Sequence, residues 1–164
     1  LLITHGHWDH MCDAHAFATA GAQVLAHKDD QQLIENIEAY RNRYQAMMPF
    51  LTEKDFHSCK VSQWLHQNDT FTALGKKFEV RHVPGHCPGS LLFYCADEKL
   101  AFTGDAIFDG SVGRTDLPNG NWNQLLKSIR EQIYTLPDDT NLLPGHGGNT
   151  SVGKEKKTNP YARP

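Results

Sequence analysis

The stretch Thr4-His5-Gly6-His7-Trp8-Asp9-His10 decides how this sequence of 164 residues is interpreted. It contains four side chains that commonly bind metals: His5, His7, Asp9 and His10. Side chains two residues apart in an extended segment point to the same side, so His5 and His7 face one way. Asp9 and His10 follow after a turn and can face a second centre. Because so short a loop rarely supplies four ligands to one tetrahedral metal, the pattern predicts two adjacent metals.

Three later motifs carry the remaining candidate ligands. His86 lies in the sequence PGHCPG, Asp105 in TGD and His146 in PGHG. Each lies just after a predicted strand or in a turn rich in Gly and Pro, and loops on a rigid scaffold are where sites are usually built. Imidazole and carboxylate ligands suit Zn(II), and they also suit Fe and Mn.

Composition narrows the classes of protein that remain. The length fits one domain better than two, since domains usually hold about 100–150 residues. The net charge of −3 does not indicate the excess of basic residues that is typical of proteins that bind nucleic acid or an anionic membrane. No stretch approaches the roughly 20 apolar residues that span a bilayer. The four cysteines form no C-x-x-C pair, so no zinc knuckle or redox motif is present. They are scattered in a chain that is long enough to fold without disulfides, which favours a reducing, cytoplasmic compartment.

The remaining segments mix helical and strand patterns. An apolar stripe at helical spacing from Leu33 to Tyr44 predicts a single helix, capped by Asp29 or Asp30 and ended by Pro49. Residues 50–68 give no clear signal. Strands mixed with amphipathic helices imply an α/β protein built of layers. Further helices are predicted over 14–20 and after Asn121, and strands over 1–4, 22–26, 70–73, 77–83, 90–95, 100–103 and 141–143.

The four motifs, in this order, resemble the metallo-β-lactamase superfamily. Within it, the chain is most similar to the glyoxalase II-like (hydroxyacylglutathione hydrolase-like) enzymes of a single-domain bacterial branch. The stretch GDAIFDGSVGRTDLPNG over 104–120 carries this narrower resemblance, together with the ending PGHG…T-x-x-G-K-E-x-x-x-NP. The resemblance extends from Leu1 to Tyr161, which is nearly the whole chain.

The resemblance implies an αββα sandwich with the metals at one edge of its two sheets. In such proteins a further stretch precedes the H-x-H-x-D-H loop and supplies the first strands. We therefore expect residues 1–164 to form one domain that lacks its first N-terminal strands. The resemblance also implies a ligand set for two metals: His5, His7 and His86 for the first, Asp9, His10 and His146 for the second, and Asp105 as the bridge.

The implied function is hydrolysis of a small-molecule thioester such as hydroxyacylglutathione by a metal-bridging hydroxide. Two nearby metals lower the pKa of a shared water toward about 7, which makes hydroxide available at neutral pH. Asp9 is expected to take the proton released during attack. Arg114 lies where glyoxalase-like relatives place a basic glutathione contact, although pairing with Asp116 to fix the turn accounts for it equally well. Trp8 is expected to line the substrate pocket.

Two other functions compete with this one. A persulfide dioxygenase with a single iron shares the H-x-H-x-D-H loop and the GRTD turn. That group typically has Ala and an acidic residue around the last His, where this chain has Gly145 and Gly147, and the difference favours the hydrolase. The other alternative is an inactive metal-binding fragment. β-Lactamase and lactonase activities are possible on the same metal centre.

Five of the ten histidines fall outside the ligand motifs. A lone histidine is more often structural or exposed than a ligand, so we expect structural roles for all five. Among these five, His82 comes nearest to a role in the site, because it lies four residues before His86 and can support that ligand without binding the metal itself. The five are His15, His27, His57, His66 and His82.

Overall fold

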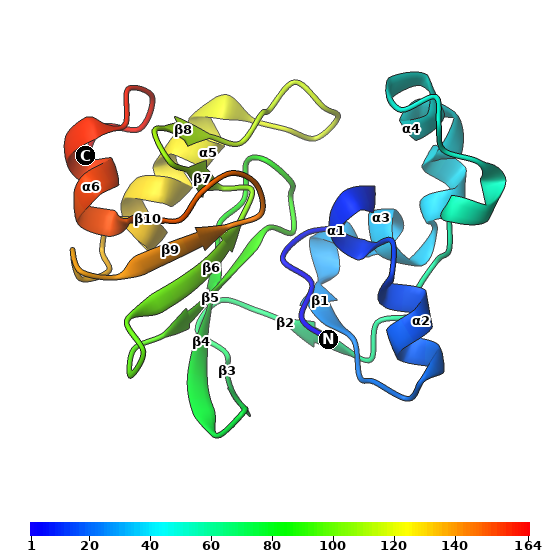
Figure 1. Ribbon diagram of the computed structural model, residues 1–164, viewed down its shortest axis with the longest axis horizontal. Coiled ribbons are helices and arrows are strands. Elements are labelled where there is room, and N and C mark those ends of the chain that lie inside the picture. Colours follow the sequence, from blue (N-terminus) through cyan, green and yellow to red (C-terminus); the bar gives the residue numbers. More distant parts are fainter.

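The computed structural model describes all residues from 1 to 164 and confirms the αββα arrangement (Figure 1). Helices cover the outer side of a small two-stranded sheet. That sheet packs on one face of a six-stranded sheet, and further helices cover the other face. Three apolar clusters lie between these four layers, so each layer buries a face against its neighbour.

The large sheet has the strand order β10-β9-β6-β5-β4-β3. All neighbours are antiparallel except β6 and β9, which run parallel. Parallel strands end at the same edge of a sheet, so the residues that follow β6 and β9 come together there. The strands are β3 (Thr70–Ala73), β4 (Lys76–His82), β5 (Leu91–Cys95), β6 (Leu100–Gly104), β9 (Asn141–Pro144) and β10 (Thr150–Ser151).

Strand β5 is buried along its whole length. Leu92 and Tyr94 face the cluster under the outer helices, whereas Leu91 and Phe93 face the small sheet. This alternation is the two-residue period of a strand that is covered on both sides. The covering elements on the outer side are α5 (Trp122–Ser128), its continuation as a π-helical turn (Ile129–Ile133), and α6 (Val152–Thr158).

The small sheet consists of β1 (Leu25–His27) and β2 (Gln63–Leu65), which run parallel. The predicted strand over 1–4 is reduced to a single bridge between Leu2 and Leu25. Strand β2 lies within 50–68, the stretch where the residue pattern predicts no element. Leu2, Leu25 and Leu65 pack against the inner face of the large sheet, so even two short strands suffice to form an inter-sheet core.

The single helix predicted over Leu33 to Tyr44 is wrong. The chain breaks at Asn36, whose φ of −145° and ψ of 40° are not helical, into α3 (Gln31–Glu35), a 3₁₀ turn (Ile37–Tyr40) and α4 (Arg41–Met47). Loop 58–61 accounts for the break, because it supplies hydrogen-bond partners at this point. The Ile37 N–H donates to the Ser58 hydroxyl at 3.1 Å, and the Glu35 carboxylate accepts from the Val61 N–H at 3.0 Å.

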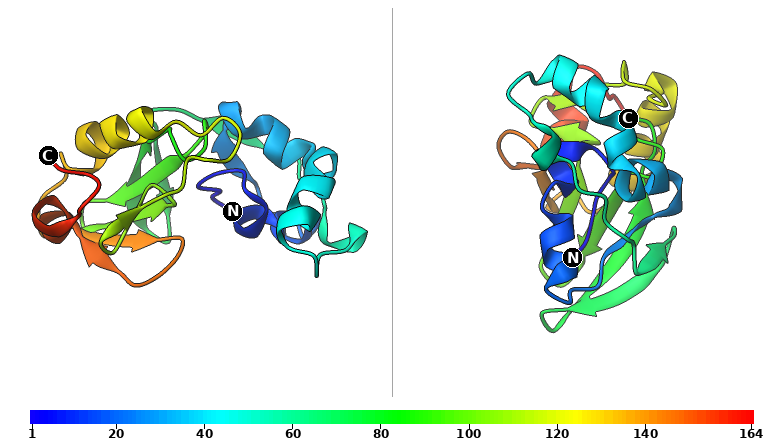
Figure 2. Two further views of the ribbon diagram at one scale, coloured as in Figure 1. Left: turned by 90° about the horizontal axis from the view of Figure 1, so that it is seen from above. Right: turned by 90° about the vertical axis from the view of Figure 1, so that its right-hand side faces the viewer.

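The short helices of the N-terminal part lie beside the large sheet, and the first loop runs between them (Figure 2). The Leu91 N–H donates to the Thr4 carbonyl at 2.7 Å across this junction. A hairpin, β7 (Ile107–Phe108) and β8 (Ser111–Val112), follows β6. The N-terminal helices are α1 (Trp8–Met11) and α2 (Ala14–Thr19), with further 3₁₀ turns at Lys28–Asp30 and Glu53–Asp55. No helix has both the length and the apolar character that crossing a bilayer requires.

Candidate metal centre

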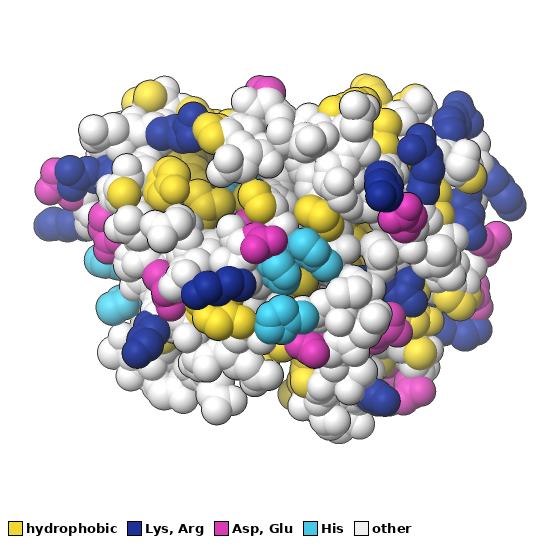
Figure 3. All heavy atoms as spheres, turned by 180° about the vertical axis from the view of Figure 1, so that it is seen from behind, with side chains coloured by type: hydrophobic (Ala, Val, Ile, Leu, Met, Phe, Trp, Pro, Cys, Tyr) yellow, Lys and Arg dark blue, Asp and Glu magenta, His cyan; other side chains and the backbone are white.

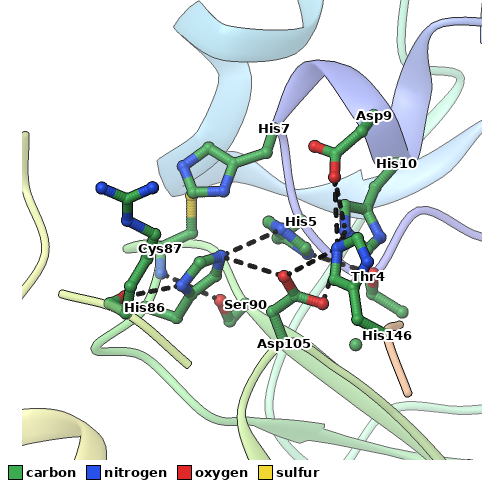
Figure 4. Close-up of polar contacts among 12 residues, drawn as sticks. Thr4, His5, His7, Asp9, His10, His86, Cys87, Ser90, Asp105 and His146 are labelled. Carbon is green, nitrogen blue, oxygen red and sulfur yellow. Dashed lines mark hydrogen bonds and ion pairs between the residues drawn. The ribbon is translucent and has the colours of Figure 1, made fainter. Parts of the chain in front are cut away.

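The seven side chains predicted as ligands come together at the junction between the helical part and the large sheet (Figure 4). Two of them lie on the extended first loop and two on α1, directly after it. The others follow strands of the large sheet, where β4, β6 and β9 end. The seven are His5, His7, Asp9, His10, His86, Asp105 and His146.

His5, His7 and His86 form a buried group whose ligand atoms all lie within 4.8 Å of one another. The Nε2 atoms of His5 and His86 are 3.2 Å apart. His86 donates from Nδ1 to the Arg114 carbonyl at 2.7 Å, which leaves the lone pair of Nε2 directed into the group. Burial lowers the pKa of His7 to about 4, and it also lowers the pKa values of His5 and His86. All three imidazoles are therefore neutral at pH 7, which is the form that binds metals.

Asp9, His10 and His146 form a second, more exposed group. The Nε2 atoms of His10 and His146 are 3.2 Å apart, and Asp9 Oδ2 lies 3.2 Å from His146 Nε2. Burial alone would lower the pKa of His10, but its interactions with Asp105 and Asp9 raise it overall. The side chain of His146 is 56% exposed, so this group forms the open side of the site.

Asp105 lies between the two groups. Its Oδ2 is 3.6 Å from His86 Nε2 and 3.4 Å from His146 Nε2, and its Oδ1 is 3.4 Å from His10 Nε2. Burial would raise the pKa of Asp105, but His10 beside it lowers the pKa overall. Oδ1 is buried without a hydrogen-bond partner, which is costly in the absence of another ligand. A cation shared by both groups would satisfy this oxygen, so the donors present fit two divalent metals.

Gly145 allows this close approach. A Cβ atom at this position would lie 2.3 Å from Asp105 Oδ1 and 2.4 Å from the Cε1 atom of His10. Any larger residue would therefore push at least one of these two donors out of place. This lack of room for a Cβ atom explains why a glycine lies directly before His146 in the PGHG motif.

Asp30 is a functional residue that the sequence did not reveal beyond a possible role in capping a helix. Its buried carboxylate accepts the Gly6 N–H at 2.8 Å and the Gly89 N–H at 2.7 Å, and so ties the first loop to the loop of His86. Burial raises the pKa of Asp30, although these two hydrogen bonds oppose the shift. The only signal in the sequence is indirect, because both partners are glycines that have no room for a Cβ: at Gly89 it would lie 2.6 Å from the Asp30 Cγ, and at Gly6 it would lie 2.6 Å from the Leu33 Cβ.

A pocket of about 430 Å³ opens over the two groups. Tyr44, Met47 and Met48 form part of its wall, and further apolar side chains come from the segment 108–117. Arg114 lies at this pocket and also pairs with Asp116 through two contacts of 2.7 Å, so both roles considered for it are compatible with the structure.

Trp8, which we expected to line the pocket, is not among the residues that line it in the structure. Its indole N–H donates to the Asp55 carbonyl at 2.7 Å, and its ring packs near Phe56 with centroids 6.1 Å apart. Trp8 points away from the donors because α1 begins at this residue and turns its side chain toward the helical core. Its side chain therefore ties the ligand loop to the helical part of the protein.

Residues 1–146 match the family model of the metallo-beta-lactamase superfamily, and the chain belongs to this superfamily. It is 35% identical to the hydroxyacylglutathione hydrolase GloC of Haemophilus influenzae, over 98% of this chain and 74% of that protein. Among solved structures, it resembles the BLEG-1 B3 metallo-beta-lactamase, with a TM-score of 0.85 and 34% identity. It also resembles TTHA1623 in a di-iron-bound form, with a TM-score of 0.82 and 32% identity. The chain covers 75% of each of these two structures, and 98% of the chain is matched.

These proteins share the fold but carry different names, so the superfamily defines a metal-binding hydrolase scaffold and not one substrate. The di-iron form of TTHA1623 is a structural relative with two metals. The substrate of this chain must therefore be argued from its own pocket and donors.

Proposed function

We propose that this chain hydrolyses the thioester of a small acyl group and a glutathione-type thiol, with two divalent metal ions. The observation that supports this proposal is the presence of two complete donor groups with Asp105 between them. Two such metals would supply a hydroxide at neutral pH and polarise an acyl carbonyl.

We assign the two groups of donors as two metal sites. His5, His7 and His86 would hold the buried metal, and Asp9, His10 and His146 would hold the metal at the open side. Asp105 would contact both. Zn(II) is the metal that we propose for these imidazole and carboxylate donors, and Fe and Mn are compatible with the same set.

The residues around the donors support a thioester substrate. Met47, Met48 and Leu117 offer apolar contact area for the aliphatic parts of an acyl thiol. Arg114 can share its guanidinium between Asp116 and a substrate carboxylate, since five N–H donors are available on it. Asp9 is 42% exposed and lines the pocket, and we assign its carboxylate to take the proton that the nucleophile loses. A departing thiolate needs little help from an acid, because the thiol pKa is about 8.5.

A dioxygenase with one iron is less compatible with this arrangement, because it needs only one group of donors. The second group is complete here, and Gly145 is required for it. An alanine at this position, which is typical of the dioxygenase group, would clash with His10 and Asp105 in this chain.

The test is an assay of the purified protein loaded with Zn(II), Fe(II) or Mn(II). We expect two metals per chain and hydrolysis of S-lactoylglutathione. Asp105→Ala should lose both metals and the activity, whereas His57→Ala should behave like the wild type, because His57 is exposed and belongs to none of the donor groups. One iron per chain with oxygen uptake on glutathione persulfide would contradict the proposal. Hydrolysis of a β-lactam without thioester hydrolysis would contradict it as well.

We also propose that the protein acts in the cytoplasm. All four cysteines are free thiols, and three of them are buried. Buried reduced thiols are typical of reducing compartments. Labelling of the thiols in intact cells with and without a permeant reagent would test this placement.

A further inference from the structure

Three of the five remaining histidines gather at a second place in the fold. His27 ends β1, His66 follows β2 and His82 ends β4, so two sheets contribute to the cluster. The rings of His27 and His82 stack with centroids 4.1 Å apart at an interplanar angle of 13°. The ring of His66 lies 6.1 Å from that of His27. On the face shown in Figure 3, histidine side chains gather beside acidic ones near the middle of the molecule.

We propose that His27, Asp29 and His82 form an additional metal-binding site, separate from the centre described above. The ligand atoms of these three residues all lie within 4.8 Å of one another. Two imidazoles and a carboxylate are the donors of a borderline divalent cation, of which Zn(II) is the representative. His66 is largely exposed, and a rotation of its side chain would complete the coordination.

The hydrogen bond of the His82 ring leaves one of its nitrogens available as a ligand. Its Nε2 lies 2.7 Å from the Pro88 carbonyl, and because a carbonyl only accepts, Nε2 carries the proton. Nδ1 is then unprotonated, and it has no partner within the protein. Metal-binding histidines typically donate their other ring nitrogen to a carbonyl or carboxylate in this way.

His27 is also in the form that binds metals. Its Nδ1 accepts the Asp29 N–H over a long distance of 3.2 Å, so this nitrogen is unprotonated. Burial lowers the pKa of His27 to about 4, which keeps the ring neutral. A bound cation would replace the long hydrogen bond and draw in Asp29 Oδ2, which lies 3.6 Å from Nδ1.

No charged side chain neutralises the Asp29 carboxylate. The only ionisable group within pairing distance is the His27 ring, which is neutral, and no Lys or Arg lies within that distance. The other pair of stacked histidines, His15 and His57, has centroids 5.3 Å apart and no carboxylate in a common donor group. The two pairs of stacked histidines therefore differ in that only His27 and His82 share a donor group with a carboxylate. This difference makes His57 a matched control.

A metal at this site would connect the two sheets. His27 belongs to the small sheet and His82 to the large one, and the bond to Pro88 continues into the loop of His86. We expect the cation to stabilise the junction that carries the other donors. The effect is then visible as thermal stability, independently of any catalytic activity.

The experiment is equilibrium dialysis of the full chain against Zn(II), with metal analysis and a thermal melt of each sample. We expect the wild type and His57→Asn to bind one Zn(II) more per chain than His82→Asn does, and to show an increase in Tm on binding it. Asp29→Asn changes an exposed side chain and should weaken this additional binding by about tenfold or more. Circular dichroism confirms that each variant is folded.

The comparison between variants keeps this result separate from the metal count of the main centre. Equal stoichiometry and equal affinity in the wild type, His82→Asn and Asp29→Asn would overturn the additional site. A loss that occurs equally in His57→Asn would overturn it too, because general surface binding would then account for the data.

Discussion

At the scale of single residues, the metal centre depends on side chains that are held close together without spare room. The Nε2 atoms of His5 and His86 are 3.2 Å apart, and those of His10 and His146 are equally close. Neutral imidazoles tolerate this approach, whereas protonated ones would repel. Small residues and buried hydrogen bonds around the donors therefore matter as much as the donors.

Gly145→Ala tests this requirement for space. The added Cβ would lie 2.4 Å from His10 Cε1, so we expect the metal on the side of His146 to bind at least about tenfold more weakly, with a corresponding loss of hydrolysis. The matched control is Gly148→Ala, where a Cβ meets nothing within 4 Å. Metal titration of both variants measures the effect. Equal affinities in the two variants would refute the steric argument.

Asp30→Asn tests the connection between the two ligand loops. The amide keeps one acceptor but turns an N–H₂ group toward either Gly6 or Gly89, so one buried donor loses its partner. We expect a loss of about 1–3 kcal/mol in the free energy of unfolding, measured by urea denaturation. Asp97→Asn, on an exposed turn, should change it by less than about 0.5 kcal/mol. An unchanged free energy of unfolding in Asp30→Asn would mean that the two hydrogen bonds to Asp30 contribute nothing to stability.

The sequence predicted the donors at this scale but not their supports. The histidines and aspartates lie in short motifs, and the combination of residue types in those motifs is typical of metal ligands. The orientation of Trp8 depends on where α1 begins, and the burial of Asp30 depends on contacts with residues 24 and 59 positions away. Neither property can be predicted from the residues that are neighbours in the sequence.

At the scale of elements, the ends of strands and helices place the donors. Strands β6 and β9 are parallel and pair Gly104 with Pro144, so Asp105 and His146 emerge side by side. On the other side, the PGHCPG loop lies against the first turn of α5. A Cβ on Gly85 would come within 2.3 Å of the Leu125 backbone nitrogen. The position of α5 therefore supports the loop of His86.

Asn121→Ala tests the start of α5. The Asn121 side chain accepts the Gln124 N–H at 3.0 Å, and loss of such a cap costs about 1 kcal/mol of stability. Asn123→Ala changes an exposed residue in the first turn of the same helix, so it serves as the control and should be neutral within about 0.5 kcal/mol. Chemical denaturation of both variants gives the difference. Equal stabilities would show that the cap does not hold this helix end.

All strands of the large sheet except β10, together with the cap of α5, could be predicted because their patterns are local. The break at Asn36 could not, since its cause is a loop more than 20 residues further along the chain that supplies competing hydrogen bonds. Strand β2 was missed for a similar reason. Its three residues form a strand only because β1 offers them a parallel partner.

At the scale of the whole molecule, the buried histidines couple folding to pH. The pKa of His7 falls from 6.5 to about 4 in the fold, and the pKa values of His5 and His86 fall as well. A depressed histidine pKa means that the folded state resists a proton that the unfolded chain accepts. The resulting stability is present above pH 6.5 and is lost as the pH falls toward 4. His10 opposes this trend, because its pKa is raised.

We therefore expect the metal-free protein to lose stability between pH 6.5 and 4, with His7 alone contributing about 3 kcal/mol. Urea denaturation at several pH values in the presence of a chelator measures this loss. Bound metals should protect against it in the upper part of the range, because they compete with protons for the same nitrogens. A free energy of unfolding that stays constant over this interval would contradict the prediction.

The pocket described above has a floor and a wall from different parts of the chain. The floor consists of donors spread from His7 to His146, whereas Tyr44, Met47 and Met48 of the wall come from α4 and the residue after it. The wall and the floor therefore belong to separate segments of the chain. Replacing this one short helical segment would change the shape of the pocket and leave the donors of the floor unchanged in the sequence.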